Sequence, residues 1–219
     1  MKRVAILPAL LLVSLASAKL VLPIEETGPM TINFIQGYSF DPLQEPPDLP
    51  TGLTAGAPEG EYGYYVIQFP GPVRPEWKRA VERTGVELSW YLPNYAFIAR
   101  VPNVAVDAVT DLPEVRWLGR YQPAWKIHPG LQNATGPQTL IVVFHYPETE
   151  SDLLSDLSAL GATNFQTEFN RWNKSVRLEV DASAIPAIAG LEGGRPGELT
   201  PRRWRSDGPG PARRAAIHR

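Results

Sequence analysis

Three histidines are the first residues to consider for chemistry, because imidazole can act as a metal ligand or as a general base. They are His128, His145 and His218. None has the histidine partner four residues away that a zinc-binding helix uses. We interpret each as a surface histidine, and the sequence predicts no metal site.

Other catalytic motifs are missing as well. The chain has no cysteine, no Gly-x-Ser-x-Gly elbow, no phosphate-binding loop and no dinucleotide fingerprint. Glu148, Glu150 and Asp152 precede or open an expected helix, where negative charge favours the helix dipole. A Ser-His-Asp triad is recognised by geometry, so spacing alone leaves it open. We assign no catalytic, cofactor-binding or metal residue, and expect the chain itself not to be an enzyme.

The N-terminus has the pattern of an export signal. Lys2 and Arg3 precede an apolar run over residues 4–15, and Ala16-Ser17-Ala18 forms a small-x-small cleavage site. The run is too short for a typical membrane span. We expect residues 1–18 to be a signal peptide and the mature protein to be secreted, with no stable membrane span; the alternative is an uncleaved anchor.

Proline and glycine, 23 and 18 of the 219 residues, are concentrated in two regions. Residues 19–62 form a Pro/Gly-rich lead-in in which no long helix or strand is expected. Residues 193–219 form a basic tail with seven arginines and two acidic residues, whereas residues 19–192 carry 12 basic and 21 acidic residues. The near-neutral total is therefore a sum of opposites, and we expect no nucleic-acid partner.

Residues 63–127 predict one β-α-β-β-α-β unit. Strand patterns occur near 64–69, 86–90, 97–101 and 115–121, and helical spacing occurs over 77–84 and 106–112. Pro75 fits the first turn of the first helix, and Gly85 fits its C-terminal cap.

Residues 139–192 repeat that pattern after a linker at 128–138. Apolar positions agree at an offset of 76 before the central hairpin and 79 after it, which requires one insertion of three residues in the hairpin. The sequence thus predicts an α+β fold of two tandem ferredoxin-like modules. Residues 194–198, Gly-Arg-Pro-Gly-Glu, stand where the last strand of the second module should begin. We therefore expect this module to lack that strand and the tail to be disordered, with a reading-frame shift as one origin.

Several stretches resemble the N-terminal pro-regions of secreted subtilisin-like serine proteases. The likeness spans residues 40–192 and is most specific over 63–127; it is carried by residues 64–73, 77–78, 91–97, 115–119 and 123–127, with Phe40-Asp41-Pro42-Leu43 and Leu49-Pro50 upstream.

The resemblance implies a folding assistant and temporary inhibitor whose partner is a subtilisin-like catalytic domain, in cis or in trans. It implies that the sheet docks on the protease. It also implies that the catalytic domain follows the second module, so the resemblance assigns no catalytic residue in this chain. A free-standing secreted inhibitor and a non-enzymatic adhesion module stay open as alternatives. We expect a monomer without cofactors, and a partner surface at Arg116, Trp117, Tyr121, Trp125 and Lys126.

Overall fold

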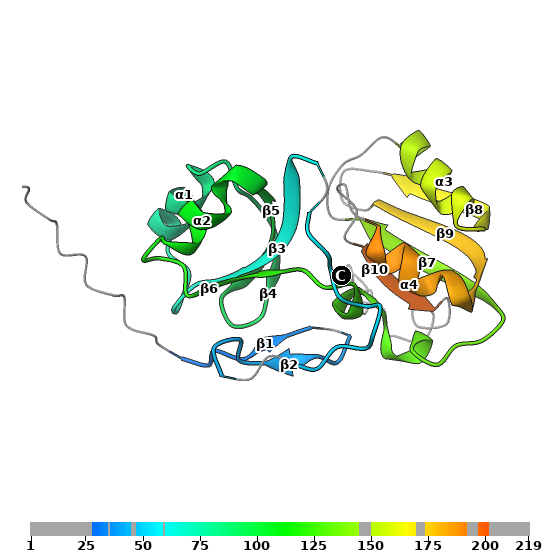
Figure 1. The fold of residues 1–219 in the computed structure, drawn as a ribbon, viewed down its shortest axis with the longest axis horizontal. Coiled ribbons are helices and arrows are strands. Elements are labelled where there is room, and N and C mark those ends of the chain that lie inside the picture. The colour runs from blue at the N-terminus through cyan, green and yellow to red at the C-terminus, as the bar shows by residue number, and fades with distance from the viewer. Residues whose placement is uncertain are drawn as a thin grey trace, which may run out of the picture.

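The computed structural model describes residues 28–34, 36–44, 47–58, 60–144, 150–169, 174–191 and 197–201. The predicted signal peptide, His145, His218 and residues 202–219 lie outside the described residues. Within the part that is described, no helix is long and apolar enough to cross a membrane. The fold is a mixed α and β structure with three sheets (Figure 1).

The first unit has the element order that the sequence predicts. Its elements are β3 (Tyr62–Gln68), α1 (Pro75–Glu82), β4 (Glu87–Leu92), β5 (Ala96–Pro102), α2 (Val106–Thr110) and β6 (Trp117–Arg120). The four strands are antiparallel and lie in the order β4-β5-β3-β6. A 3-10 turn, Asn103–Ala105, precedes α2.

Proline and glycine set the ends of these elements as predicted. Pro75 is the first residue of α1, where its missing amide proton is harmless. Gly85 follows α1 with a φ of +88°, the left-handed conformation that glycine adopts without a Cβ clash. Asn94 and Tyr95 both have positive φ in the tight turn between β4 and β5.

The second unit repeats the order. Its elements are β7 (Pro137–Phe144), α3 (Glu150–Ala159), β8 (Thr163–Phe169), β9 (Lys174–Asp181), α4 (Ile185–Gly190) and β10 (Gly197–Pro201). The antiparallel order is β10-β7-β9-β8, so last, first, third and second strands are neighbours in both sheets. Gly161, 76 residues after Gly85, also has a positive φ, +83°.

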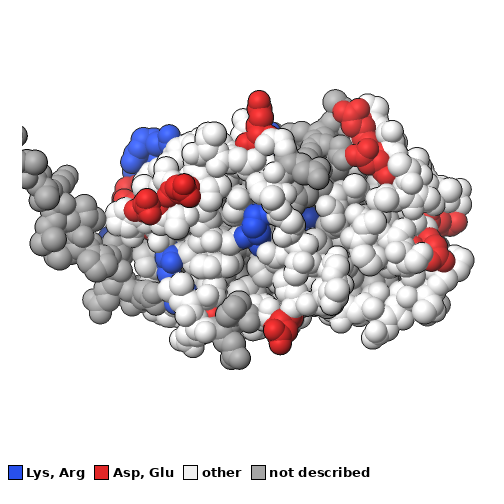
Figure 2. Space-filling model, in the orientation of Figure 1, with Lys and Arg blue, Asp and Glu red and all other residues white. Residues whose placement is uncertain are grey.

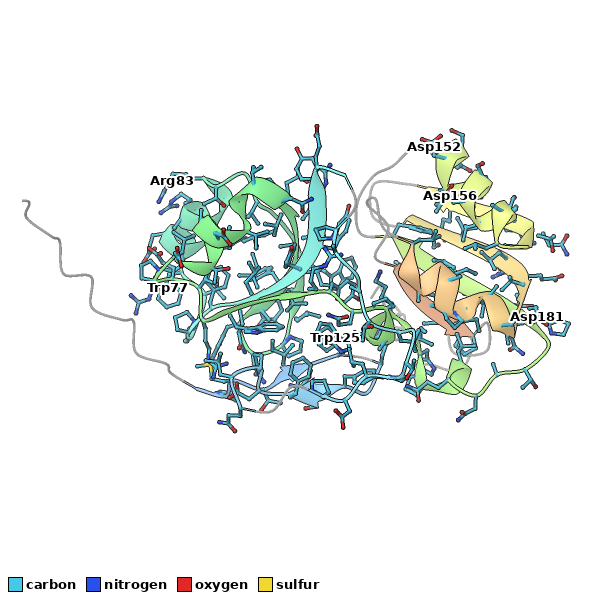
Figure 3. The ribbon with its side chains drawn as sticks, in the orientation of Figure 1. Trp77, Arg83, Trp125, Asp152, Asp156 and Asp181 are labelled. Carbon is cyan, nitrogen blue, oxygen red and sulfur yellow. The ribbon has the colours of Figure 1, made fainter. Side chains whose placement is uncertain are left out.

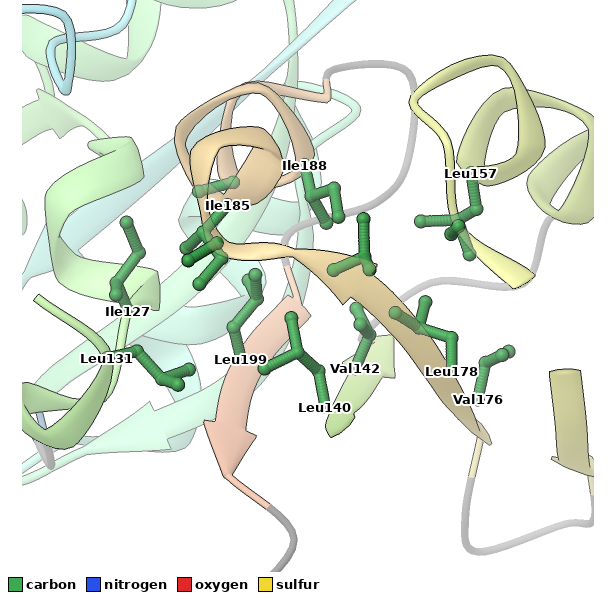
Figure 4. Packing of buried hydrophobic residues seen from close by; sticks show 14 of the residues in the cluster. Ile127, Leu131, Leu140, Val142, Leu157, Val176, Leu178, Ile185, Ile188 and Leu199 are labelled. Atoms are coloured by element: carbon green, nitrogen blue, oxygen red, sulfur yellow. The ribbon is translucent and has the colours of Figure 1, made fainter. Parts of the chain in front are cut away.

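Strand β10 corrects the expectation that the second unit lacks its last strand. It pairs with β7 from Gly197↔Phe144 to Pro201↔Leu140, the position that β6 takes beside β3. The physical reason is that β10 is the outermost strand of its sheet; its outer side meets the connection at Ile127 and His128 through Leu199, and an edge strand of this kind tolerates proline. Leu199 supplies the buried apolar side chain (Figure 4).

Each unit has a hydrophobic core between its sheet and its helices. In the second, Leu199 lies with Leu140, Leu178 and Ile185, and two residues from the preceding connection, Ile127 and Leu131, join them (Figure 4). In the first, the core holds Ile67, Phe69, Trp77, Val81 and Val109, among others.

The lead-in covers the other face of the first sheet. Here we call residues 28–53, as far as they are described, the strap; it includes the two-stranded sheet of β1 (Ile32–Asn33) and β2 (Ser39–Phe40). Ile32, Phe34 and Phe40 of the strap are buried in a third cluster with residues from β3, β5 and the segment after β6. The lead-in aromatic residues thus pack on the folded body. Figure 1 shows β1 and β2 below the first sheet.

The connection between the two units, residues 121–136, runs from the end of the predicted first module into the predicted linker at 128–138, and it contributes to two hydrophobic clusters. It contains two 3-10 turns, Pro123–Lys126 and Pro129–Leu131. Ala124 and Trp125 belong to the cluster beneath the strap, while Ile127 and Leu131 belong to the core of the second unit. His128 donates its amide to the carbonyl of Leu199 at 3.0 Å, which ties the connection to β10.

Candidate functional site

An ion pair inside the protein joins the strap to the first sheet. Arg116, just before β6, donates from Nη1 and Nη2 to the two carboxylate oxygens of Asp41 at 2.8 and 3.1 Å. Only 4% of the Arg116 side chain and 12% of the Asp41 side chain are exposed. A buried pair of this kind stabilises a structure only when its geometry is good and its other polar atoms are satisfied.

Gln68 forms one of the additional hydrogen bonds to the Arg116 guanidinium. Its Oε1 accepts from Nη1 of Arg116 at 2.9 Å, and its Nε2 donates to the carbonyls of Met30 and Asn94 at 2.7 and 3.1 Å. Asn94 in turn donates from Nδ2 to the carbonyl of Thr31 at 2.5 Å. The strap backbone is therefore held by side chains of β3 and of the β4–β5 turn. We call the set Asp41, Gln68, Asn94 and Arg116 the clamp.

The contacts of Asp41 within the clamp keep its carboxylate deprotonated. Burial alone would raise its pKa, but hydrogen bonds from Arg116 and from the amide of Leu43, together with the Arg116 charge, lower the pKa below its ordinary value of 3.8. The carboxylate is thus held ionised, which keeps both prongs of the pair in place.

Three of the residues predicted as a partner surface lie in the aromatic cluster beneath the strap. Trp125 stacks on Phe34 with ring centroids 4.7 Å apart, and Tyr121 lies 6.2 Å from both rings. Trp117 is half-buried and meets Phe40 edge-on at 6.3 Å. Figure 3 shows Trp125 between the first sheet and the strap.

Lys126, the last of the predicted residues, is also buried. Its Nζ donates to the carbonyl of Ala189 in α4 at 2.8 Å. This hydrogen bond fastens the connection between the units to the second unit.

Within this chain, Arg116, Tyr121 and Trp125 contact the strap, Trp117 is half-buried beside it, and Lys126 bonds to α4. The partner surface at these five residues stays a prediction. Sequence reasoning missed Asp41 and Gln68. The available signal was Gln68 itself, a polar residue placed among the apolar residues of β3 at a position that faces the strap.

The second sheet has a face with a different character. On the side away from α3 and α4, one row across the strands holds Thr200, Ile141, Arg177 and Gln166. Nη1 of Arg177 donates to Oε1 of Gln166 at 3.1 Å. A pocket of about 190 Å³ is lined by three of these residues, Ile141, Gln166 and Arg177, together with Thr167, Glu168 and Ser175. We call this the polar face; the hydrophobic clusters formed by described residues include none of its side chains.

Of the histidines and acidic residues considered in the sequence, His128, Glu150 and Asp152 are described, and the histidine lies in a different element from the two acidic residues. His128 accepts a hydrogen bond at Nδ1 from the amide of Gly130 at 3.1 Å, in a 3-10 turn. Glu150 and Asp152 lie in the first turn of α3, and Figure 2 shows acidic side chains over that helix. Among the described residues, no group of three or more histidine, aspartate or glutamate side chains is placed to hold a metal ion.

Comparison with known proteins gives one match. A family described as a domain of unknown function (DUF8729) matches residues 34–122, fewer than half of the chain. The match begins inside the strap and ends after β6, so it spans the strap and the first sheet together. No curated protein and no solved structure matches the chain.

Proposed function

We propose that the chain is a non-catalytic pro-region of a secreted subtilisin-like serine endopeptidase, and that it assists folding of the catalytic domain and inhibits it temporarily. The observation that carries the proposal is the shared strand order of the two sheets, last-first-third-second, with two helices on one side. This order supports assigning each unit as a ferredoxin-like module, the fold that the resemblance implies for such pro-regions.

The polar face of the second sheet is the surface that we propose for docking on the protease. The strap already occupies the corresponding face of the first sheet, so Tyr64, Val66 and Ile98 are buried there. On the polar face, Ile141 and Ser175 are buried, whereas Gln166 and Glu168 are exposed and Arg177 is half-buried around the pocket. Polar and charged groups of this kind confer specificity and speed of association on a protein interface.

The test combines refolding and inhibition of a subtilisin-like catalytic domain, with the full chain added in trans. We expect the chain to raise the yield of active protease after denaturation and to inhibit the native protease. Arg177→Glu on the polar face should weaken inhibition at least tenfold, and Arg83→Glu, on an exposed residue after α1, should leave it unchanged. Inhibition without help in folding would favour a free-standing inhibitor. If the chain at high concentration neither inhibits the protease nor helps it fold, both the pro-region and the inhibitor proposals are overturned.

A further inference from the structure

A short segment between the strap and the first sheet is accessible from solvent. Thr54, Gly56 and Ala57 are exposed, Ala55 is half-buried, and none of the four lies in a helix or strand. A Cβ atom placed on Gly56 would meet no heavy atom within 4 Å. One side of the segment lines a pocket of about 600 Å³ whose other walls include Pro123, Asp156 and Gly190, and Thr54, Gly56 and Ala57 are open to solvent.

Few hydrogen bonds hold this segment in place. The amide of Ala55 donates to Oε1 of Gln122 at 2.6 Å. Just before the segment, the carbonyl of Leu53 accepts from the amide of Ala124 at 3.1 Å. Within the described structure, the backbone groups of Thr54, Gly56 and Ala57 make no hydrogen bond to the protein. The free energy needed to lift the segment away from the body is accordingly small.

Two other turns of the first unit are more constrained. The turn at Asn94 and Tyr95 is tied by the amide of Phe69 to the carbonyl of Tyr95 at 3.0 Å, and by the bond from Asn94 to Thr31. The turn after α2 contains three successive backbone hydrogen bonds, made by the amides of Asp111, Leu112 and Val115. An endopeptidase must extend its substrate in its cleft, so these turns would have to unfold before they are cut.

We propose that the segment 54–57 is a proteolytic processing site, and that the strap stays bound to the first sheet after the cut. The reaction is hydrolysis of one peptide bond: the C–N bond breaks, the water oxygen joins the carbonyl carbon to give a carboxylate, and both water protons go to the released nitrogen, which becomes an ammonium group. The bond before Pro58 is excluded from the site, because the proline nitrogen carries no amide proton for the protease to bind. This inference does not depend on the proposed function.

The strap should stay bound because the residues before the cut keep their own contacts with the first sheet. The strap keeps its ion pair from Asp41 to Arg116 and the hydrogen bonds from Gln68 and Asn94 to its backbone. Its apolar residues Ile32 and Phe40 stay in the cluster that they share with the first sheet. The product is thus a nicked protein of two chains, in which loss of the clamp would release the strap and uncover an apolar face.

Limited digestion of the full chain with subtilisin, followed by intact-mass analysis and size exclusion, tests the site. We expect a cut between residues 53 and 57 before any bond within residues 60–122 is cut, and co-elution of the two fragments. Gln122→Ala should speed this cut about fivefold, because it frees the Ala55 amide. The matched control is Gln138→Ala, whose side chain donates to the carbonyl of Thr135 far along the chain from the segment and should leave the rate unchanged.

A second variant tests retention separately. Asp41→Asn should let the strap dissociate after the cut, so that the fragments elute apart, while the wild-type fragments remain together. If bonds within 60–122 are cut first, or Gln122→Ala and Gln138→Ala behave alike, the site is wrong. If wild-type fragments separate at once, retention by the clamp is wrong. Inhibition of the protease plays no part in these measurements, so their failure is distinct from failure of the proposed function.

Discussion

Arg116 and Asp41 are 75 residues apart in the sequence, yet their side chains form a two-pronged ion pair that is almost closed to solvent. The pair joins the start of β6 to the strap, and Gln68 shares Nη1 of the same guanidinium. The strap is therefore an integral layer of the first unit. The span of the family match, residues 34–122, contains both partners of the pair.

Asp41→Asn should lower the free energy of unfolding of the full chain by about 3 kcal/mol, because it leaves the buried Arg116 guanidinium without its countercharge. Chemical denaturation with urea measures the change. The control is Glu87→Gln, which breaks the pair with Arg100, where 52% and 31% of the two side chains are exposed. That change should cost about 0.5 kcal/mol. Equal effects of the two variants would contradict a stabilising role for the clamp.

Acid should remove the contribution of Asp41. Its pKa is lower in the folded chain than its ordinary value of 3.8, because the hydrogen bonds and charge of Arg116 outweigh the opposing effect of burial. A depressed folded pKa means that this stabilisation is fully present above the unfolded value and is lost as pH falls through the folded value.

The measurement is the difference in unfolding free energy between wild type and Asp41→Asn as a function of pH. We expect the difference in unfolding free energy to be constant above about pH 6. It should shrink as the pH falls below about 3.8. Other carboxylates titrate in both proteins, so the subtraction isolates Asp41. A difference that grows on acidification would show that the sign is wrong.

The element order could be predicted because local signals mark it. Pro75 begins α1, Gly85 and Gly161 follow the first helix of each unit, and β3 and β7 contain runs of aromatic or β-branched apolar residues. These signals act within a few residues of the structure that they determine.

The missed features depend on distant partners. Strand β10 contains proline and one fully buried apolar residue, Leu199, and it becomes a strand because β7 offers an edge for pairing. The contacts of Arg116 and Trp125 with the strap were missed because nothing near them in sequence reveals Asp41 or Phe34. Pairing over such separations is set by tertiary structure, so propensity and periodicity leave it open.

Leu199→Ala should destabilise the second unit by about 3 kcal/mol, because it opens a cavity among Leu140, Ile127 and their neighbours. Thermal or urea unfolding measures the loss of stability, and hydrogen exchange of the β7 amides shows whether the second unit is the part that is destabilised. Val104→Ala, at a residue that is 96% exposed, is the control and should change stability by less than about 0.5 kcal/mol. An unaffected second unit would mean that β10 does not complete its sheet.

Gly85 and Gly161 allow the two units to be compared at equivalent positions. Both have a φ near +85°, but a Cβ atom at Gly85 would lie 3.3 Å from Cγ of Pro102, whereas one at Gly161 would meet no atom within 4 Å. Gly161→Ala should cost about 1 kcal/mol from the left-handed conformation alone. Gly85→Ala should cost more, since Pro102 must also move. Gly56→Ala, at a position without positive φ or near neighbours, should be neutral. Unfolding free energies from urea titrations give the order, and an equal cost at Gly85 and Gly161 would show that Pro102 yields freely.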